Sequence, residues 1–279
     1  MERYFIADCV QTDDGLTLTA QIEIDKTQYQ EMNSWFNFAN YYHTCRSVAR
    51  MTKESGQDFI DFCERSAAEH GGHDDLEIDD FLITGNKLLI SYLSFVRMFV
   101  DVISKAIKDK KQEMLKVFQK FNREMYDSFF GYRLLTRMRN YVLHYEMPLT
   151  AVTDSVEHGI VFTCDKDNLL RYDRWSTLKS EIDALPKRFS ILPMISECQS
   201  AIDTLFLKAL EIIADDVFSG NEKLVAFCRQ HNIRSPIILI LDDSTDAPPK
   251  LRKFPLHILR KYLMDLNRHP SYEIDIINE

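Results

Sequence analysis

The chain has little of what marks several common classes of protein. Only 8 of its 279 residues are glycine, and it contains neither a GxGxxG fingerprint nor a P-loop, so nothing supports a glycine-rich loop that cradles a nucleotide phosphate. Its six cysteines form no CxxC pair, which argues against zinc knuckles, and a chain of this length needs no disulfide framework. We therefore expect buried, reduced thiols and a cytoplasmic location.

The sequence also shows no pattern typical of a signal peptide or a membrane span. The N-terminus has no basic segment followed by a long apolar run. The longest apolar stretches, near 88–104 and 204–213, are interrupted by charged residues such as Arg97 and Lys208, so neither predicts a membrane span. We expect no membrane partner.

Basic residues are the minority charge. The chain has 43 acidic and 34 basic side chains, a formal net charge of −9, which argues against a protein that coats nucleic acid non-specifically. A local basic cleft on an acidic body is still compatible with this balance. The 45% hydrophobic and 28% charged content is that of an ordinary globular protein.

The periodicity of apolar residues predicts a mainly helical chain. An N-terminal hairpin is expected from strands 2–10 and 16–24, followed by a helical stretch from Asp25 to about Ala68 with a break near Ser55-Gly56, and then a loop over 69–80. Further along, the predicted elements are helices over about 79–107, around 114–121 and 128–145, a hairpin over 150–164, helices over 175–185 and 190–231 with a bend near Ser219-Gly220, a strand over 235–242 and a helix over 254–266.

These elements group into three segments. Residues 1–78 form an N-terminal hairpin plus a helical region, residues 79–232 an antiparallel helical bundle, and residues 233–279 a small strand-and-helix appendage. The predicted fold class is therefore mainly α, with peripheral β-hairpins on a helical bundle.

The helix predicted over 128–145 has two chemically different faces when its residues are placed at 100° intervals. One arc is apolar and should face the core: Leu134, Leu135, Met138, Tyr141, Val142 and Tyr145. The opposite arc is polar: Arg133, Arg137, Asn140 and His144, with Arg139 at its edge. The polar arc is the candidate functional surface.

These residue types suit the cleavage of RNA by its own 2′-hydroxyl. A histidine exchanges protons near neutral pH, and a guanidinium binds phosphate oxygens in a fork without losing its charge. Fixed positive charge where negative charge develops is often the largest catalytic contribution. No metal and no other cofactor is needed for this reaction.

The segment Arg139-Asn140-Tyr141-Val142-Leu143-His144 resembles the Arg-polar-x(3–5)-His motif of HEPN ribonucleases. The resemblance covers at most residues 79–232 and implies a HEPN-like antiparallel helical bundle. It also implies that Arg139 and His144 are the essential catalytic pair and that Asn140 assists them. Arg133 and Arg137 are then auxiliary RNA contacts.

The resemblance further implies a metal-independent endoribonuclease that acts as a homodimer with a composite site. Members of this family are often toxins or antiviral defence effectors, so an antitoxin or regulatory protein is an expected partner beside RNA. Arg139 and His144 lie about 140° apart on an ideal helix, and two opposed copies of the polar arc would bring such residues together.

Other interpretations stay open. A HEPN-like dimer could bind RNA, a nucleotide or a protein without cutting, or the chain could be a structural adaptor. Arg and Asn are common on the wet face of a bundle helix, and a histidine near a helix C-terminus interacts favourably with the helix dipole.

The residues before the motif are basic. Between Lys105 and Arg139 there are ten basic and four acidic side chains, a net charge of +6, and the interleaved aromatics Tyr126, Phe129, Phe130 and Tyr132 belong either to the core or to base stacking. Glu69, His70, His73, Asp74 and Asp75 lack a closed metal-ligand spacing. His43 and Cys45 suggest helix packing, so no metal site is predicted.

Overall fold

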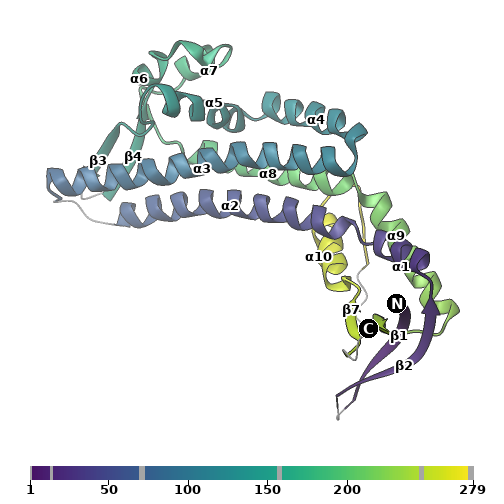
Figure 1. The fold of residues 1–279 in the computed structure, drawn as a ribbon. Helices are drawn as coiled ribbons and strands as arrows, with labels where there is room; N and C mark the ends of the chain where they lie inside the picture. The colour runs from purple at the N-terminus through teal and green to yellow at the C-terminus, as the bar shows by residue number, and fades with distance from the viewer. Residues whose placement is uncertain (1, 13–14, 69–72, 156–158, 245–247, 276–279) are drawn as a thin grey trace. The chain divides into compact units, whose positions relative to one another are not determined.

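The chain folds into two compact parts. A computed structural model describes residues 2–12, 15–68, 73–155, 159–244 and 248–275 (Figure 1). The described residues are mainly helical with small antiparallel sheets, as predicted. We call the two parts unit 1, Met1–His43 with Leu210–Glu279, and unit 2, Thr44–Ala209.

Unit 2 is built on long helices. These are most of α2 (Phe38–Ala68), α3 (Asp75–Lys110), α4 (Leu115–Ser128), α5 (Phe130–His144) and most of α8 (Leu192–Glu211). In Figure 1, α2 and α3 run side by side in opposite directions. The Thr52 hydroxyl of α2 donates to the Phe95 carbonyl of α3 at 3.3 Å, and Lys53 pairs with Asp203 of α8 at 3.0 Å.

Short elements close one end of unit 2. They are the 3₁₀ turn η2 (Asp173–Trp175), helices α6 (Lys166–Leu170) and α7 (Leu178–Asp183), and a sheet in the order β3 (Ala151–Ser155), β4 (Gly159–Asp165), β5 (Arg188–Phe189). The 3₁₀ turn η1 (Gln112–Met114) joins α3 to α4. Buried Asn86 of α3 fixes the chain ahead of β3, because its amide accepts from the Leu149 N–H at 3.0 Å and donates to the Leu149 carbonyl at 2.9 Å.

Unit 1 combines a sheet with helices. The sheet has the antiparallel order β2 (Gly15–Ile24), β1 (Glu2–Thr12), β6 (Pro236–Asp242), β7 (Lys250–Lys253), and its helices are α1 (Lys26–Ser34), α9 (Ala214–Gln230) and α10 (Leu256–Leu266). Ile6 of β1 lies opposite Ile22 on one side and Ile238 on the other. This pairing joins the first and last segments of the chain in one sheet.

Several predicted elements are confirmed. The N-terminal hairpin forms, with its Asp13-Asp14 turn outside the described residues, and β3 and β4 form the hairpin predicted over 150–164. Asp25 caps α1 through a capping box with Gln28, which satisfies backbone N–H groups that the helix leaves unpaired.

Two predicted helix breaks are wrong in position. The first helical stretch breaks over 35–37 rather than at Ser55-Gly56. Helix α2 continues through Gly56. A Cβ atom at this position would meet the Tyr92 ring and the Gln199 amide, so the glycine permits close helix packing. The later stretch breaks at Ile212-Ile213, and α9 runs through Ser219-Gly220 without a bend.

The loop predicted over 69–80 is shorter than expected. Helix α3 starts at Asp75, where Asp74 forms a capping box with Glu77, while residues 69–72 lie outside the described ranges. Strand β7 was not predicted. Among the described helices, none is long and apolar enough to cross a membrane.

Candidate functional site on helix α5

Helix α5 is held firmly at its first turn. The Gly131 N–H donates to the Glu197 carboxylate of α8 at 2.7 Å. A Cβ atom at Gly131 would collide with the backbone of Met194, so the glycine permits α5 to lie directly against α8. A carboxylate at a helix N-terminus also interacts favourably with the helix dipole. The rest of the helix is therefore presented from a fixed base.

The apolar arc predicted for α5 is largely correct. Leu134, Leu135, Met138 and Tyr141 are fully buried, and α5 packs against α3 and α4. Tyr145 is the exception, since 48% of its surface is exposed. Its backbone leaves the helical conformation at φ −138°, ψ −77° because α5 ends at His144, so helical spacing no longer predicts its direction.

The polar arc is exposed at three of its four predicted positions. Arg137, Asn140 and His144 are exposed, and Asn140 lies one helical turn before His144. The side chains of Asn140 and His144 have no hydrogen-bond partner among the described residues. They are therefore free to meet a ligand.

Arg133 is the fourth member of this arc and is engaged inside the chain. Its Nη1 donates to the carbonyls of Tyr126 and Asp127 at 2.7 and 2.8 Å, and its Nη2 pairs with Glu181 at 2.5 Å. Only 13% of the Arg133 side chain is exposed. The guanidinium thus closes the C-terminal end of α4 and holds α7 beside α5, which leaves few donors for RNA.

Arg137 is exposed but oriented by a neighbour. Its Nε donates to the Tyr126 hydroxyl at 2.9 Å, which leaves both terminal nitrogens of the fork pointing away from that bond. Tyr126 therefore supports two arginines, one through its backbone carbonyl and one through its ring hydroxyl. The sequence pattern predicts a stacking or core role for Tyr126 and gives no sign that it positions two arginines.

Arg139 lies at the edge of the exposed face and is partly buried. Its Nε is buried and has no hydrogen-bond partner within the described part of the chain. A buried unpaired donor costs free energy, about 1–3 kcal/mol and more for a charged group. Such a group is a candidate to receive an anionic ligand, and it is the only one of the five predicted site residues with this property among those described.

The end of α5 is surrounded by aromatic rings. Tyr141 stacks on Trp175 with ring centroids 5.6 Å apart, and Tyr172 contacts Tyr141, Tyr145 and Trp175. Burial, with a smaller contribution from Glu146, raises the pKa of Tyr141 far above its usual value. This phenol stays protonated at neutral pH.

Exposed apolar side chains flank His144. Leu143, Tyr145 and Met147 have 55%, 48% and 52% of their surface exposed. We call these three residues the α5 apolar patch. Exposed apolar side chains beside polar groups are a feature of many interaction surfaces.

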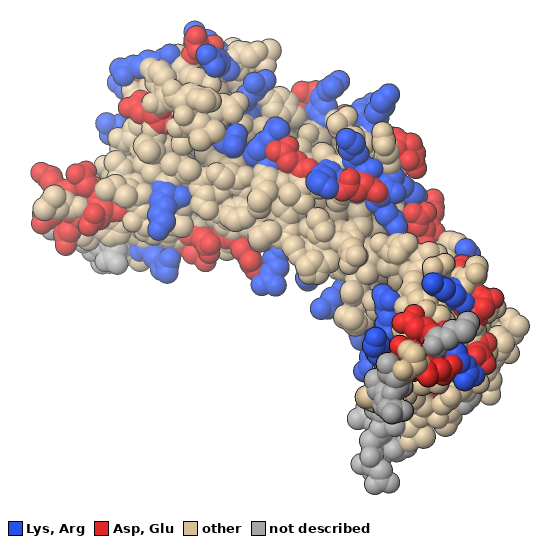
Figure 2. Space-filling view, viewed as in Figure 1, with Lys and Arg blue, Asp and Glu red and all other residues tan. Residues whose placement is uncertain are grey.

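Basic residues gather on the helices that precede α5. Figure 2 shows Lys and Arg side chains over α4 and the adjoining end of α3, mixed with acidic ones. Some are paired along their own helix, as Lys105 is with Asp109 and Lys120 with Glu124. Of the four aromatics predicted either to stack on bases or to lie in the core, only Tyr132 is fully buried, while Tyr126, Phe129 and Phe130 are half-buried.

Metal ligands do not gather anywhere in the described ranges. There, no group of three or more His, Cys, Asp or Glu side chains is arranged to hold a metal ion. Glu69 and His70 lie outside these ranges. His43 is exposed on α2 whereas Cys45 is buried.

Comparisons with protein families, with curated proteins and with solved structures find no match to this chain. A function can therefore be inferred only from the residues of α5 and their surroundings.

Proposed function

We propose that the protein is a metal-independent endoribonuclease of the HEPN type, with Arg139, Asn140 and His144 as its catalytic residues. The observation that carries the proposal is the pairing state of these residues on α5. Asn140 and His144 are exposed without internal partners, and the Nε of Arg139 is buried and unpaired. Structural arginines are normally satisfied inside the fold, as Arg133 is.

The proposed reaction is transesterification within the RNA strand. The 2′-oxygen attacks the adjacent phosphorus and loses its proton to a base, and the bond to the 5′-oxygen breaks as that oxygen gains a proton. His144 exchanges these protons, and Arg139 binds the phosphate oxygens as negative charge develops on them. Asn140 orients the substrate, Arg137 is an auxiliary phosphate contact, and the products are a 2′,3′-cyclic phosphate and a free 5′-hydroxyl.

The proposal includes a symmetric homodimer. A single α5 presents its polar residues on a convex face, which cannot exclude water from a phosphate. Two copies opposed through the α5 apolar patch would bury Leu143, Tyr145 and Met147 and place two His144 side chains near a common axis. The patch supports this arrangement because it lies at the His144 end of the helix and offers the apolar contact needed to offset repulsion between the arginines.

The experiment that tests the function is an RNA cleavage assay in EDTA. We expect the full chain to cut total RNA, and we expect His144→Ala and Arg139→Gln each to reduce the rate by about 10²-fold or more. Matched controls are His257→Ala and Arg229→Gln, because both side chains are exposed and lie in unit 1. Cleavage that needs a divalent metal, or that persists equally in both α5 variants, would contradict the proposal.

A binding module that does not cut is the second candidate, because the unpaired Arg139 Nε and the exposed side chains of Asn140 and His144 could equally hold a ligand without cleaving it. Salt-sensitive RNA binding that depends on Arg137 and Arg139, without cleavage in any condition, would support this module instead. The ribonuclease proposal also includes a role as a toxin or defence effector that a protein partner restrains.

A further inference from the structure

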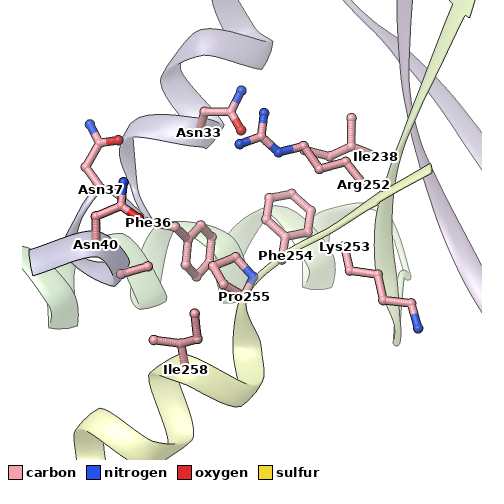
Figure 3. Close-up of a pocket in the computed structure, with 11 residues that line it drawn as sticks. Asn33, Phe36, Asn37, Asn40, Ile238, Arg252, Lys253, Phe254, Pro255 and Ile258 are labelled. Atoms are coloured by element: carbon pink, nitrogen blue, oxygen red, sulfur yellow. The ribbon is translucent and has the colours of Figure 1, made fainter. Parts of the chain in front are cut away.

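A pocket in unit 1 has a lining unlike that of the α5 surface. Its cavity volume is about 310 Å³, which is at the lower end for small-molecule sites. Its walls come from α1, the connector that follows it, the start of α2, strands β6 and β7, and the start of α10 (Figure 3). The pocket therefore joins segments more than 200 positions apart in the sequence.

Three amides line one side of the pocket. Asn33, Asn37 and Asn40 contribute side chains that form no hydrogen bond to any described residue. Each amide offers two donors and one carbonyl acceptor. Paired donors and acceptors of this kind match the edges of nucleobases, and asparagine is a common reader of adenine.

A guanidinium lies at the other side. The Nη1 of Arg252 donates to the Tyr29 hydroxyl at 3.0 Å, which fixes the side chain and leaves its other donors without a partner among the described residues. Figure 3 shows this guanidinium pointing toward Asn33, with Lys253 extending from the rim. No Asp or Glu is among the described lining residues, although acids outnumber bases in the whole chain. The charge of the lining therefore favours an anion.

The floor is apolar. The rings of Phe36 and Phe254 pack with centroids 5.4 Å apart, and Pro255 and Ile258 extend the surface beneath the amides. A flat heterocycle is the ligand group that uses such a floor, because it buries its faces while its edge reaches hydrogen-bonding groups.

We propose that this pocket binds one nucleotide unit, with the phosphate on Arg252, the base on the Phe36–Phe254 floor and the base edge on the asparagine amides. The volume suits a mononucleotide and is small for a dinucleotide. The unit is either a free nucleotide or the terminal nucleotide of an RNA strand. This inference does not depend on the function proposed for α5, because all the lining residues belong to unit 1.

The test is calorimetric titration of the full chain with AMP, UMP, adenosine and inorganic phosphate. We expect a mononucleotide to bind and its nucleoside to bind at least about tenfold more weakly, since the nucleoside lacks the phosphate that would pair with the Arg252 guanidinium. Arg252→Gln and Asn33→Asp should each weaken nucleotide binding at least about tenfold. Asn33→Asp replaces only the amide NH2 group with an oxygen. It places a carboxylate beside the guanidinium, where it competes with phosphate.

Lys250→Gln is the matched control. Lys250 is an exposed cation on the same strand and does not line the pocket, so this variant should bind the nucleotide as the wild type does. An unchanged melting temperature for Asn33→Asp separates lost binding from lost folding.

The source of the nucleotide is resolved by competition. A six-residue RNA that displaces AMP indicates a strand end, and an RNA that fails to displace it indicates a free nucleotide; either result supports the site. No binding of any mononucleotide, equal competition by inorganic phosphate alone, or binding unaffected by both Arg252→Gln and Asn33→Asp would overturn it. Loss of cleavage in His144→Ala with retained nucleotide binding would show that the two proposals stand separately.

Discussion

The two units present polar groups in opposite ways. Unit 2 places Arg137, Asn140 and His144 on the outside of one helix, where all of them are exposed to water. Unit 1 gathers its amides and Arg252 around a cavity that already has an apolar floor. A convex surface needs a second surface before it can exclude water, whereas a pocket has its walls in one chain. Cleavage should therefore depend on assembly, and nucleotide binding should not.

The difference extends to how each site is supported. The α5 arginines are oriented by Tyr126 and Glu181, which lie within unit 2 and act through hydrogen bonds. Arg252 is oriented by Tyr29 across 223 positions of the chain. In both cases a tyrosine hydroxyl accepts from a guanidinium and fixes its direction. The arginine therefore has fewer rotamers before the ligand binds, which lowers the entropy cost of binding.

Breaking the α5 apolar patch should give the largest effect on assembly and RNA cleavage. We expect Leu143→Glu to shift the protein from dimer to monomer, because a charge buried in an apolar interface costs about 2 kcal/mol or more, roughly thirtyfold in the dimer dissociation constant. The sedimentation coefficient and the rate of RNA cleavage should fall together, while the affinity for AMP stays unchanged. Met264→Glu, on an exposed position of α10, is the control, and cleavage by a monomeric Leu143→Glu at the wild-type rate would refute the composite site.

Side-chain tethers offer a comparison of stability. Asn86 satisfies both backbone groups of Leu149 in unit 2, and the Asp8 carboxylate accepts from the N–H groups of Arg234 and Ser235 in unit 1 at 3.1 and 2.6 Å. Asn86→Leu should cost about 3 kcal/mol, because the backbone groups of buried Leu149 lose their partners. Asp8→Ala should cost less, about 1 kcal/mol, because Arg234 and Ser235 are exposed and water can replace the carboxylate. Urea titrations measure both, and a cost below about 0.5 kcal/mol for either would show that the tether is replaceable.

The arginines of α5 should separate into structural and ligand-binding groups. Arg133→Gln should lower the free energy of unfolding by about 1–3 kcal/mol, since Glu181 and two carbonyls lose their donor. Arg137→Gln should change it by less than about 0.5 kcal/mol and should lower the salt dependence of RNA binding by roughly one counterion. The same stability loss for both variants would contradict the division into a structural arginine, Arg133, and a ligand-binding arginine, Arg137.

Thiol reactivity gives the smallest expected effect and still divides the units. Burial raises the pKa of Cys63, Cys164 and Cys198 in unit 2 to about 12, and Cys45 is buried as well. Because the thiolate is the reactive form, iodoacetamide at pH 8 should leave these four unmodified. The half-buried Cys9 and Cys228 of unit 1 should react first. Burial, with a smaller contribution from Asp8, raises the pKa of Cys228, so its reaction should speed up as the pH rises. Peptide mapping checks this, and early labelling of Cys164 would contradict the packing of unit 2.

The sequence predicts unit 2 better than unit 1 because its signals are local. Helical spacing correctly placed Leu134, Leu135 and Met138 in the core and His144 outside it. It could not predict the role of Arg133, whose acceptors are backbone carbonyls of a preceding helix and a carboxylate 48 positions away. Tyr145 was assigned to the core because the pattern does not show that α5 ends one residue earlier.

The pocket of unit 1 had no local signal of comparable strength. The spacing of Asn33, Asn37 and Asn40 is visible, but the connector at 35–37 reads as helix because Trp35 and Phe36 fit an apolar stripe. Contact between Phe36 and Phe254 is decided by tertiary packing. Strand β7 is short and fully exposed, so neither alternation nor hydrophobicity marks it. The pairing of β1 with β6, which joins the first and last segments, is likewise a long-range contact that the local sequence does not predict.

The most direct test of the central claim is to identify the ends of RNA cut by the full chain in EDTA. The account predicts 2′,3′-cyclic phosphate and 5′-hydroxyl ends, no cutting at a 2′-deoxy position, and loss of these products in His144→Ala. Products with 3′-hydroxyl and 5′-phosphate ends, or an unchanged product pattern in His144→Ala, would contradict the assignment of cleavage chemistry to helix α5.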